Sequence, residues 1–188
     1  GKDPTFLVGG VTKNYAGNYR LGKGPHFVVE GDEYDTAYFD KGPKFLHYQP
    51  KTLILTSVEF DHADIYRDLP HYEAAFEKLV QLVPAGGTIA VSAAWPNAVR
   101  IARQSRARVV TYGAKEGELH AEKLQLGAEG ARFEVIHEGR SLGEVLLPMA
   151  GAHNVENALG VFAAGLAVGL TFEELKQGFA SFEGVKRR

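Results

Sequence analysis

Two acidic clusters, each placed directly after an apolar run, are the residues of this sequence best suited to bind a metal ion. The first reads EGDEYD and begins at Glu30, and the second reads VEFDHADIY and contains His62. Carboxylates and a neutral imidazole are acceptable ligands for a hard divalent cation that bridges phosphates, usually Mg²⁺. Ligands of an open α/β sheet bind beyond the carboxyl ends of its strands. Glu30 and His62 are therefore expected to meet at one edge if their strands are neighbours.

Solvation is a simpler interpretation of the other acids in the first cluster. Asp32, Glu33 and Asp35 could cap a following helix and face water, and Asp35 and Asp40 fit an exposed first turn equally well. If all the acids were solvated in this way, the chain would be a non-catalytic binding module that holds no metal.

A metal-dependent phosphohydrolase is a further interpretation of the same clusters. Glu30, Asp61, His62 and Asp64 could form a two-metal site that hydrolyses phosphate esters. This interpretation gives no role to a third polar motif, GAHNVENA, at residues 151–158.

The GAHNVENA motif opens a predicted helix, whose first backbone N–H groups lack partners within the helix. Asn154 and Asn157 are three residues apart and share one face. Two side-chain amides can pair with the donor and acceptor edge of adenine, with His153 beside them. An ordinary helix cap with a solvated Asn157 also explains the motif, and physical chemistry alone favours that simpler interpretation.

Apolar runs that alternate with helical patterns predict the elements that position these residues. The runs read as buried parallel strands at 5–10, 26–30, 52–57, 88–93 and 108–113, and the helical patterns cover 69–84 and 97–106. The predicted fold class is therefore α/β, with an open, mostly parallel sheet flanked by helices. The stretch 11–25 is rich in Gly, Asn and Lys and is expected to be an irregular loop.

The pattern changes after residue 117. Residues 118–149 alternate at period two and predict three antiparallel strands joined by tight turns. A helix over 150–169, capped by Asn154 or His153, and a second helix over 171–182 with a capping box follow. We expect one domain over 1–188, with a parallel part (1–117), an antiparallel part (118–149), a helical part (150–184) and the start of a hinge (185–188).

Composition excludes several classes of protein. The 188 residues carry a net charge of −2, so no basic surplus favours nucleic acid or an anionic membrane. The sequence has no Cys, which rules out disulfides and fits a cytoplasmic protein. No apolar run approaches the roughly 18 residues of a membrane span.

Four motifs in register carry a resemblance to a known family. EGDEYD, VEFDHADIY, GAHNVENALGVFAA and FEGVKRR, in this order and spacing, resemble the central domain of the Mur ligases. The resemblance covers nearly the whole chain. It implies a bacterial, ATP-dependent enzyme that phosphorylates a carboxylate and couples the acyl phosphate to an amine. The stretch from Glu30 to Tyr48 is most similar to the branch that joins murein tripeptide to UDP-N-acetylmuramate in peptidoglycan recycling. The second most similar branch is the one that adds L-alanine to the same nucleotide.

The resemblance also implies roles for single residues. Glu30 is expected to hold Mg²⁺, and His62 to bind a second Mg²⁺ or lie next to it. Asn154 and Asn157 are expected to contact the adenine of ATP, with His153 beside them. Arg188 matches an arginine that in the family lies at the hinge to the next domain and can approach the nucleotide.

The segment of Thr12, Lys13 and Asn14 is expected, on a weaker match, to face the sugar-nucleotide substrate. In several Mur ligases a carbamylated lysine follows the DH motif by one helix. An ungapped match puts Phe76 at that position, which cannot ligate a metal, so no carbamate is expected here. Lys78 lies two residues further on and points to another side of the helix.

The family's P-loop is the largest departure from the pattern, because no GxxxxGK[ST] occurs anywhere in the sequence. Both ends of the sequence look cut, which predicts a piece of a longer ligase, truncated before the P-loop and inactive alone. A missing strand would leave an open sheet edge, so we expect the piece to self-associate through that edge.

Overall fold

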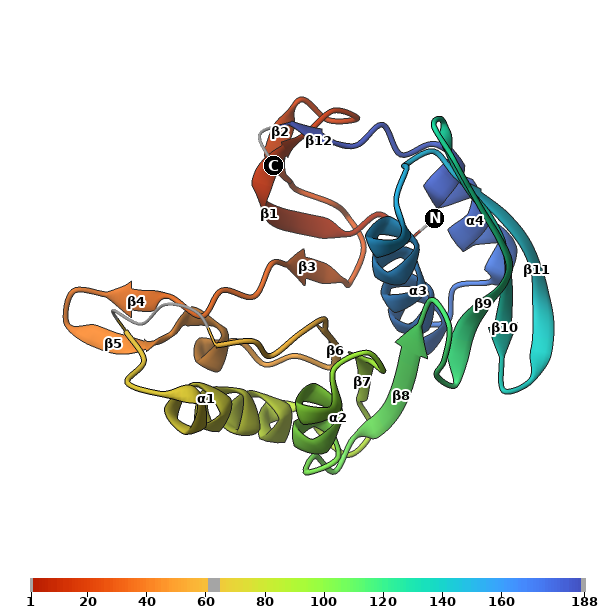
Figure 1. Cartoon of the computed structure of the whole chain (residues 1–188). Helices are drawn as coiled ribbons and strands as arrows, with labels where there is room; N and C mark the ends of the chain where they lie inside the picture. The colour runs from red at the N-terminus through yellow and green to blue at the C-terminus, as the bar shows by residue number, and fades with distance from the viewer. Residues whose placement is uncertain (1, 61–64, 187–188) are drawn as a thin grey trace.

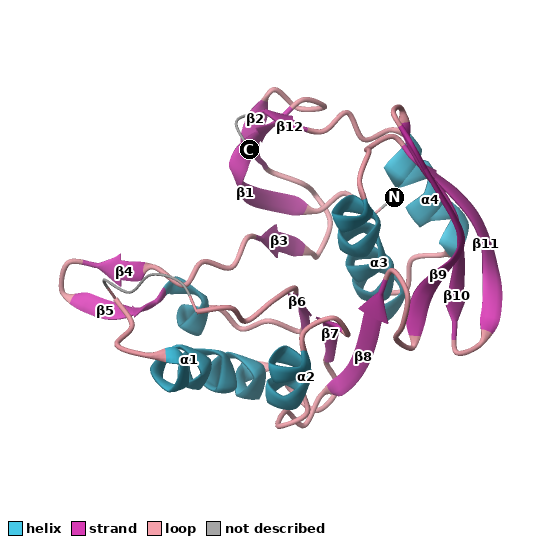
Figure 2. Ribbon diagram, in the orientation of Figure 1, coloured by secondary structure: helices cyan, strands magenta, loops and turns pink. Residues whose placement is uncertain are grey.

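A six-stranded mixed sheet forms the centre of the molecule (Figures 1 and 2). The computed structural model describes residues 2–60 and 65–186. Strands β6, β7, β8 and β9 run parallel, and β9, β10 and β11 form antiparallel pairs, in the order β11-β10-β9-β8-β7-β6. The six strands are β6 (Thr52–Leu55), β7 (Thr88–Ser92), β8 (Arg108–Gly113), β9 (Leu119–Gly127), β10 (Gly130–His137) and β11 (Arg140–Leu147). The α/β class and the three antiparallel strands expected at 118–149 are thus confirmed.

Helices cover both faces of this sheet. Helices α1 (Leu69–Leu82) and α2 (Pro96–Ala102) pack on one face, and α3 (Ala152–Ala167) and α4 (Phe172–Ala180) pack on the other. Strand β7 shows the reason, since Ile89 and Val91 enter the core under α1 and α2, whereas Ala90 enters the core under α3. Successive side chains of a strand point to opposite faces, so an unbroken apolar run needs cover on both sides.

A second sheet contains the N-terminal strands, which corrects the expectation that the second and third apolar runs are neighbours. Strand β1 (Thr5–Thr12) pairs with β2 (Gly17–Arg20) and β12 (Val185–Lys186) in antiparallel fashion and with β3 (Phe27–Val29) in parallel. Strand β3 therefore belongs to a different sheet from β6. An apolar run specifies a strand but not its partner, which packing decides.

Two segments expected to be irregular or helical form hairpins instead. The stretch 11–25 contains the turn between β1 and β2 and the whole of β2, because Thr12 and Gly17 pair across that turn. The acidic segment after Glu30 leads into β4 (Asp35–Ala37) and β5 (Asp40–Pro43) and then a short 3₁₀ helix (Lys44–His47), so the expected helix cap by the acids is wrong. This second hairpin extends away from the sheets in Figure 1.

Helix ends follow local sequence rules, with one exception. The Asp68 side chain accepts from His71 N at 2.8 Å and caps α1, and the predicted capping box of Thr171 and Glu174 is present at α4. The N-cap of α3 is Gly151, with φ of 101° and no side-chain hydrogen bond, so the expected cap by Asn154 or His153 is wrong. Of the helices in the described residues, none has the length and apolar character required to cross a bilayer.

Candidate functional site

Glu30 lies at the carboxyl end of β3 and is fixed there by β1. Its carboxylate accepts a hydrogen bond from Gly9 N at 2.7 Å, and its own backbone N–H donates to Leu7 O at 3.2 Å. The side chain is half-buried. Both bonds come from the parallel pairing of β3 with β1, so the sheet holds the carboxylate in one place.

The two acidic segments contact each other although their strands belong to different sheets. The buried Tyr66, the last residue of the second cluster, donates its hydroxyl hydrogen to Glu33 O at 2.9 Å. Asn97 of α2 donates to Val58 O at 2.5 Å and so fixes the start of the second cluster. The two clusters therefore contact each other through loop residues and not through neighbouring strands, and the meeting of Glu30 with His62 stays a prediction.

Four of the predicted site residues lie outside the described residues: Asp61, His62, Asp64 and Arg188. Their assignments therefore remain predictions from the sequence.

A different group of possible metal ligands occurs in the described residues. Glu118, His137 and Glu138 place ligand atoms within 4.8 Å of one another, far along the chain from Glu30. Arg108 Nη2 lies 3.0 Å from Glu118 Oε1 and 3.1 Å from Glu138 Oε1. The guanidinium thus supplies the positive charge that a metal ion would bring to the two carboxylates, and we interpret this group as an ion-pair network.

The N-terminal part of α3 presents the predicted adenine-binding residues. His153 and Asn157 are exposed and Asn154 is half-buried. Asn154 Nδ2 donates to Ala150 O at 2.7 Å, which engages one of its amide hydrogens and fixes the side chain. The Asn157 amide and the His153 ring are both accessible to a ligand.

Glu156, between the two asparagines, is a residue that sequence reasoning missed. It accepts a hydrogen bond from the hydroxyl of Ser92 at the end of β7, and Ser92 is 1% exposed. Burial, and secondly the nearby Glu156 carboxylate, raise the pKa of the Tyr112 hydroxyl on β8. The available signal was the one acid of a helix whose remaining residues after Asn157 are all apolar, because such an acid needs a polar partner when it is buried.

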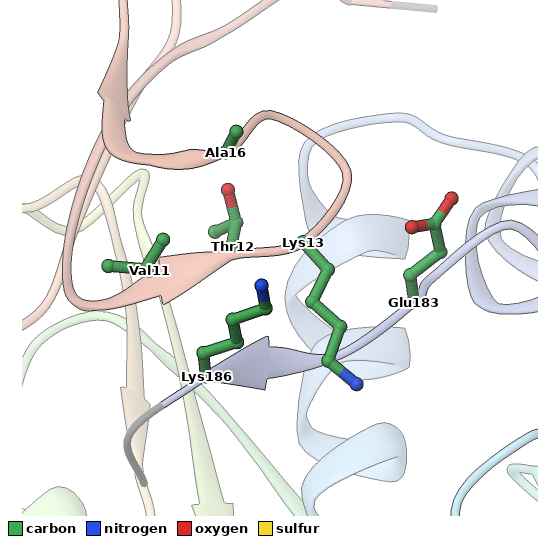
Figure 3. A pocket seen from close by; sticks show the side chains of 6 residues that line it. All are labelled: Val11, Thr12, Lys13, Ala16, Glu183 and Lys186. Atoms are coloured by element: carbon green, nitrogen blue, oxygen red, sulfur yellow. The ribbon is translucent and has the colours of Figure 1, made fainter.

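Thr12, Lys13 and Asn14 lie at the turn of the β1–β2 hairpin, beside the C-terminal segment. Asn14 Nδ2 donates to Ser181 O at 2.7 Å and Glu183 N donates to Asn14 Oδ1 at 3.0 Å, so this amide joins the two segments. A hollow of about 390 Å³ lies next to them (Figure 3), lined by Val11, Thr12, Lys13, Ala16, Glu183 and Lys186.

Phe76 is part of the core beneath the acidic segments. It is 7% exposed, and its ring lies 5.3 Å from that of Phe45 and 5.0 Å from that of Tyr72. This aromatic cluster gives Phe76 a packing role, and Lys78 on the same helix is exposed.

Comparison with curated proteins assigns the chain to a family. The family described as the Mur ligase middle domain matches residues 23–165. The UDP-N-acetylmuramate–L-alanyl-γ-D-glutamyl-meso-2,6-diaminoheptandioate ligase of Haemophilus influenzae is 38% identical over 97% of this chain and 40% of its own length. The UDP-N-acetylmuramate–L-alanine ligase of Salinibacter ruber is 36% identical over 100% of this chain and 38% of its own. The chain thus spans about two fifths of the curated relatives it matches.

Solved structures give the same assignment. The UDP-N-acetylmuramate:L-alanyl-γ-D-glutamyl-meso-diaminopimelate ligase from Neisseria meningitides superposes with a TM-score of 0.88 and 36% identity, over 100% of this chain and 60% of that one. The UDP-N-acetylmuramate–alanine ligase from Thermotoga maritima gives a TM-score of 0.82 and 29% identity, over 100% and 40%. Fold and sequence therefore agree that the chain belongs to the Mur ligase family and carries its middle domain.

Proposed function

We propose that the protein to which this chain belongs is an ATP-dependent ligase that joins murein tripeptide to UDP-N-acetylmuramate through an acyl phosphate. The similarity to the tripeptide ligase of Haemophilus influenzae, 38% over 97% of the chain, carries this proposal. The Neisseria tripeptide ligase supports it, with a TM-score of 0.88 against 0.82 for the Thermotoga L-alanine ligase. The enzyme would act in peptidoglycan recycling in the bacterial cytoplasm, the setting that the family resemblance implies.

Addition of L-alanine to the same nucleotide is the second candidate. The Salinibacter ruber L-alanine ligase is 36% identical, only slightly below the tripeptide ligase. Both candidates need the same central machinery and differ in the incoming amine.

An assay of the full-length protein separates the candidates. ADP release is measured with UDP-N-acetylmuramate and either tripeptide or L-alanine. The proposal expects release that depends on the tripeptide, whereas release with L-alanine alone would support the second candidate. Hydrolysis of a simple phosphate ester with Mn²⁺, without either amine, would instead favour a phosphohydrolase that uses Glu30, Asp61, His62 and Asp64.

We further propose that Glu30 is a ligand for Mg²⁺ that accompanies the ATP phosphates. Magnesium is commonly held by one or two carboxylates together with water and phosphate oxygens, so one fixed carboxylate fits such a site. The 2.7 Å bond from Gly9 N holds Glu30 Oε2 in place at the carboxyl end of β3. When bound, Mg²⁺ would neutralise charge on the transferred phosphoryl group. His62 is proposed, on sequence grounds, to bind a second Mg²⁺ or to lie next to it.

The exposed end of α3 is proposed to bind adenine. Asn157 and His153 are accessible, and Asn154 is held by Ala150 O with its Oδ1 able to accept. An amide supplies both a donor and an acceptor, which matches the edge of adenine. Arg188 is proposed to approach the nucleotide from the hinge. Thr12, Lys13 and Asn14 are proposed to face the sugar nucleotide, beside the hollow of Figure 3.

A nucleotide titration tests these roles. ATP with Mg²⁺ is added to the ¹⁵N-labelled chain and to Glu30→Gln and Asn157→Ala variants. We expect shifts near Glu30 that require Mg²⁺ and are lost in Glu30→Gln, and shifts along α3 that are lost in Asn157→Ala. Identical shifts in all three proteins would contradict both assignments.

The 188-residue chain alone is proposed to lack ligase activity, because its sequence contains no GxxxxGK[ST] to grip the phosphates. ADP release by this chain that depends on both substrates would overturn the proposal. The full-length protein, assayed in parallel, is the positive control.

Self-association through a sheet edge is proposed for the same chain. Among the described strands, β6 has a ladder partner on one side only, β7, and its Ile54 is 37% exposed. Unpaired backbone groups on an apolar edge strand favour pairing with another chain. Light scattering over a concentration series should show dimers, and Ile54→Lys should shift the chain towards monomer. A monomer at every concentration would rule this out.

A further inference from the structure

Helix α3 docks on two strands through two matched pairs of residues. Ser92 on β7 and Tyr112 on β8 are direct partners in the parallel ladder, so their Cα atoms lie side by side. Glu156 and Gly160 are one helical turn apart and share one face of α3. Glu156 contacts Ser92, and Gly160 packs against Tyr112.

The hydrogen bond between Ser92 and Glu156, called the tether from here on, lies among the apolar side chains that pack between α3 and the sheet. Apart from the tyrosines, Ser92 is the one buried polar side chain among the described residues, and its hydroxyl donates to the Glu156 carboxylate. A buried hydroxyl requires a partner, and a hydrogen bond to a charged acceptor is stronger than one between neutral groups. The bond therefore fixes the rotation of α3 about its axis at residue 156.

The contact between Gly160 and Tyr112 sets the distance between α3 and the sheet. A Cβ atom at Gly160 would lie 2.8 Å from Tyr112 Cζ, so the absence of a side chain allows close approach. Tyr112 is 1% exposed and cannot move aside without opening the core.

We infer that Glu156 is a positioning residue that, through Ser92, orients Asn154 and Asn157 for nucleotide binding. The inference rests on the proposed adenine site. Helix α3 has no side-chain cap at Gly151, so the Asn154 bond to Ala150 O and this tether are the side-chain hydrogen bonds that hold the start of the helix, in addition to the packing of the buried Val155. Loss of the tether would let the turn rotate and would move both amides.

Side-chain amide resonances test the inference without a ligand. In ¹⁵N-labelled Glu156→Ala and Ser92→Ala chains, the amide signals of Asn154 and Asn157 should shift, and Glu156→Gln, which keeps an acceptor oxygen, should restore them. Glu173→Ala, an exposed acid on α4, is the control and should leave them unchanged. Ser92→Ala leaves the helix sequence intact and serves if Glu156→Ala does not fold. Unchanged signals in a folded Glu156→Ala or Ser92→Ala chain would overturn the inference.

ATP affinity provides the second readout, because loss of a residue that only stabilises the fold would leave the affinity of the folded chain unchanged. Glu156→Ala and Ser92→Ala should each weaken ATP binding by about tenfold, which corresponds to a binding-competent orientation of the amides that is populated about one tenth of the time. The double variant should be no weaker than either single one, because both remove the same bond. If ATP binding is unchanged in Glu156→Ala but weakened in Asn157→Ala, the inference about Glu156 is wrong and the proposed adenine site stands. Binding unchanged in Asn157→Ala would sink the proposed adenine site, and the ligand-free signals would then decide the inference.

Discussion

The hydroxyl of Tyr66 donates to the backbone carbonyl of Glu33 at 2.9 Å and joins the loops that follow two different sheets. Tyr66 is 3% exposed, and its ring packs against Tyr72 of α1 with the centroids 4.8 Å apart. The contact brings the segment after Glu30 next to the segment after β6. A core aromatic residue thus joins the segment that follows Glu30 to the segment that follows β6.

Removal of this hydroxyl should weaken the fold modestly. Tyr66→Phe keeps the ring but leaves Glu33 O without this donor, so the free energy of unfolding should fall by about 1 kcal/mol. Urea unfolding measures the change. Tyr19→Phe is the matched control, since Tyr19 is 66% exposed and its variant should stay within about 0.5 kcal/mol of the original chain. Equal stability of both variants would show that the Tyr66 bond contributes nothing.

Two glycines in helices should respond in opposite directions to the same substitution. Gly160→Ala places Cβ 2.8 Å from Tyr112 Cζ and should destabilise the chain by about 1–3 kcal/mol through overpacking. Gly178→Ala on α4 meets nothing within 4 Å and should stabilise it by up to about 1 kcal/mol, the difference in helix propensity. Thermal unfolding compares them, and a stable Gly160→Ala variant would contradict the close packing of α3.

The capping box of α4 should make stability depend on pH. Hydrogen bonds from the backbone N–H and then the hydroxyl of Thr171 lower the pKa of Glu174 below its ordinary value. A lowered folded-state pKa gives stability that is present above the unfolded pKa and is lost as pH falls through the folded one.

Glu174→Gln tests this dependence, because Gln can form the box without ionising. We expect the variant to lose less stability than the original chain between about pH 5 and pH 3. Urea unfolding at each pH gives the comparison, with the original chain as reference. Parallel curves would show that Glu174 does not contribute to the acid sensitivity.

The amide of Asn14 should protect the C-terminal segment from solvent exchange. Asn14→Ala removes the acceptor of Glu183 N and the donor to Ser181 O, so the Glu183 amide should exchange about tenfold faster. Asn18→Ala, an exposed residue of β2, is the control and should leave this amide unchanged. Equal protection in both variants would show that β12 alone holds the segment.

Local patterns in the sequence were sufficient for the elements whose determinants lie within a few residues. The apolar stripe over 69–84 predicted α1, the alternation after residue 117 predicted the antiparallel strands, and Thr171 with Glu174 predicted the start of α4. Helical and strand periods, and capping boxes, depend on near neighbours in the chain. The fold class followed from the order of these elements.

The candidate site was predictable in part. Glu30 and the asparagines of α3 stood out by residue type and by the family resemblance, but Glu156 did not, because its partner Ser92 is 64 residues away. The hairpin at 11–25 was missed because Gly- and Asn-rich turns resemble irregular loops in sequence.

The sequence by itself determined which segments form strands and helices and which polar residues follow them. Only the tertiary structure decided that β3 pairs with β1 and not with β6, that Tyr66 reaches Glu33, and that Asn14 binds Glu183, 169 residues later. Such contacts depend on which apolar faces pack together once the chain is compact. A local pattern states that a face must be buried but does not name the face that covers it.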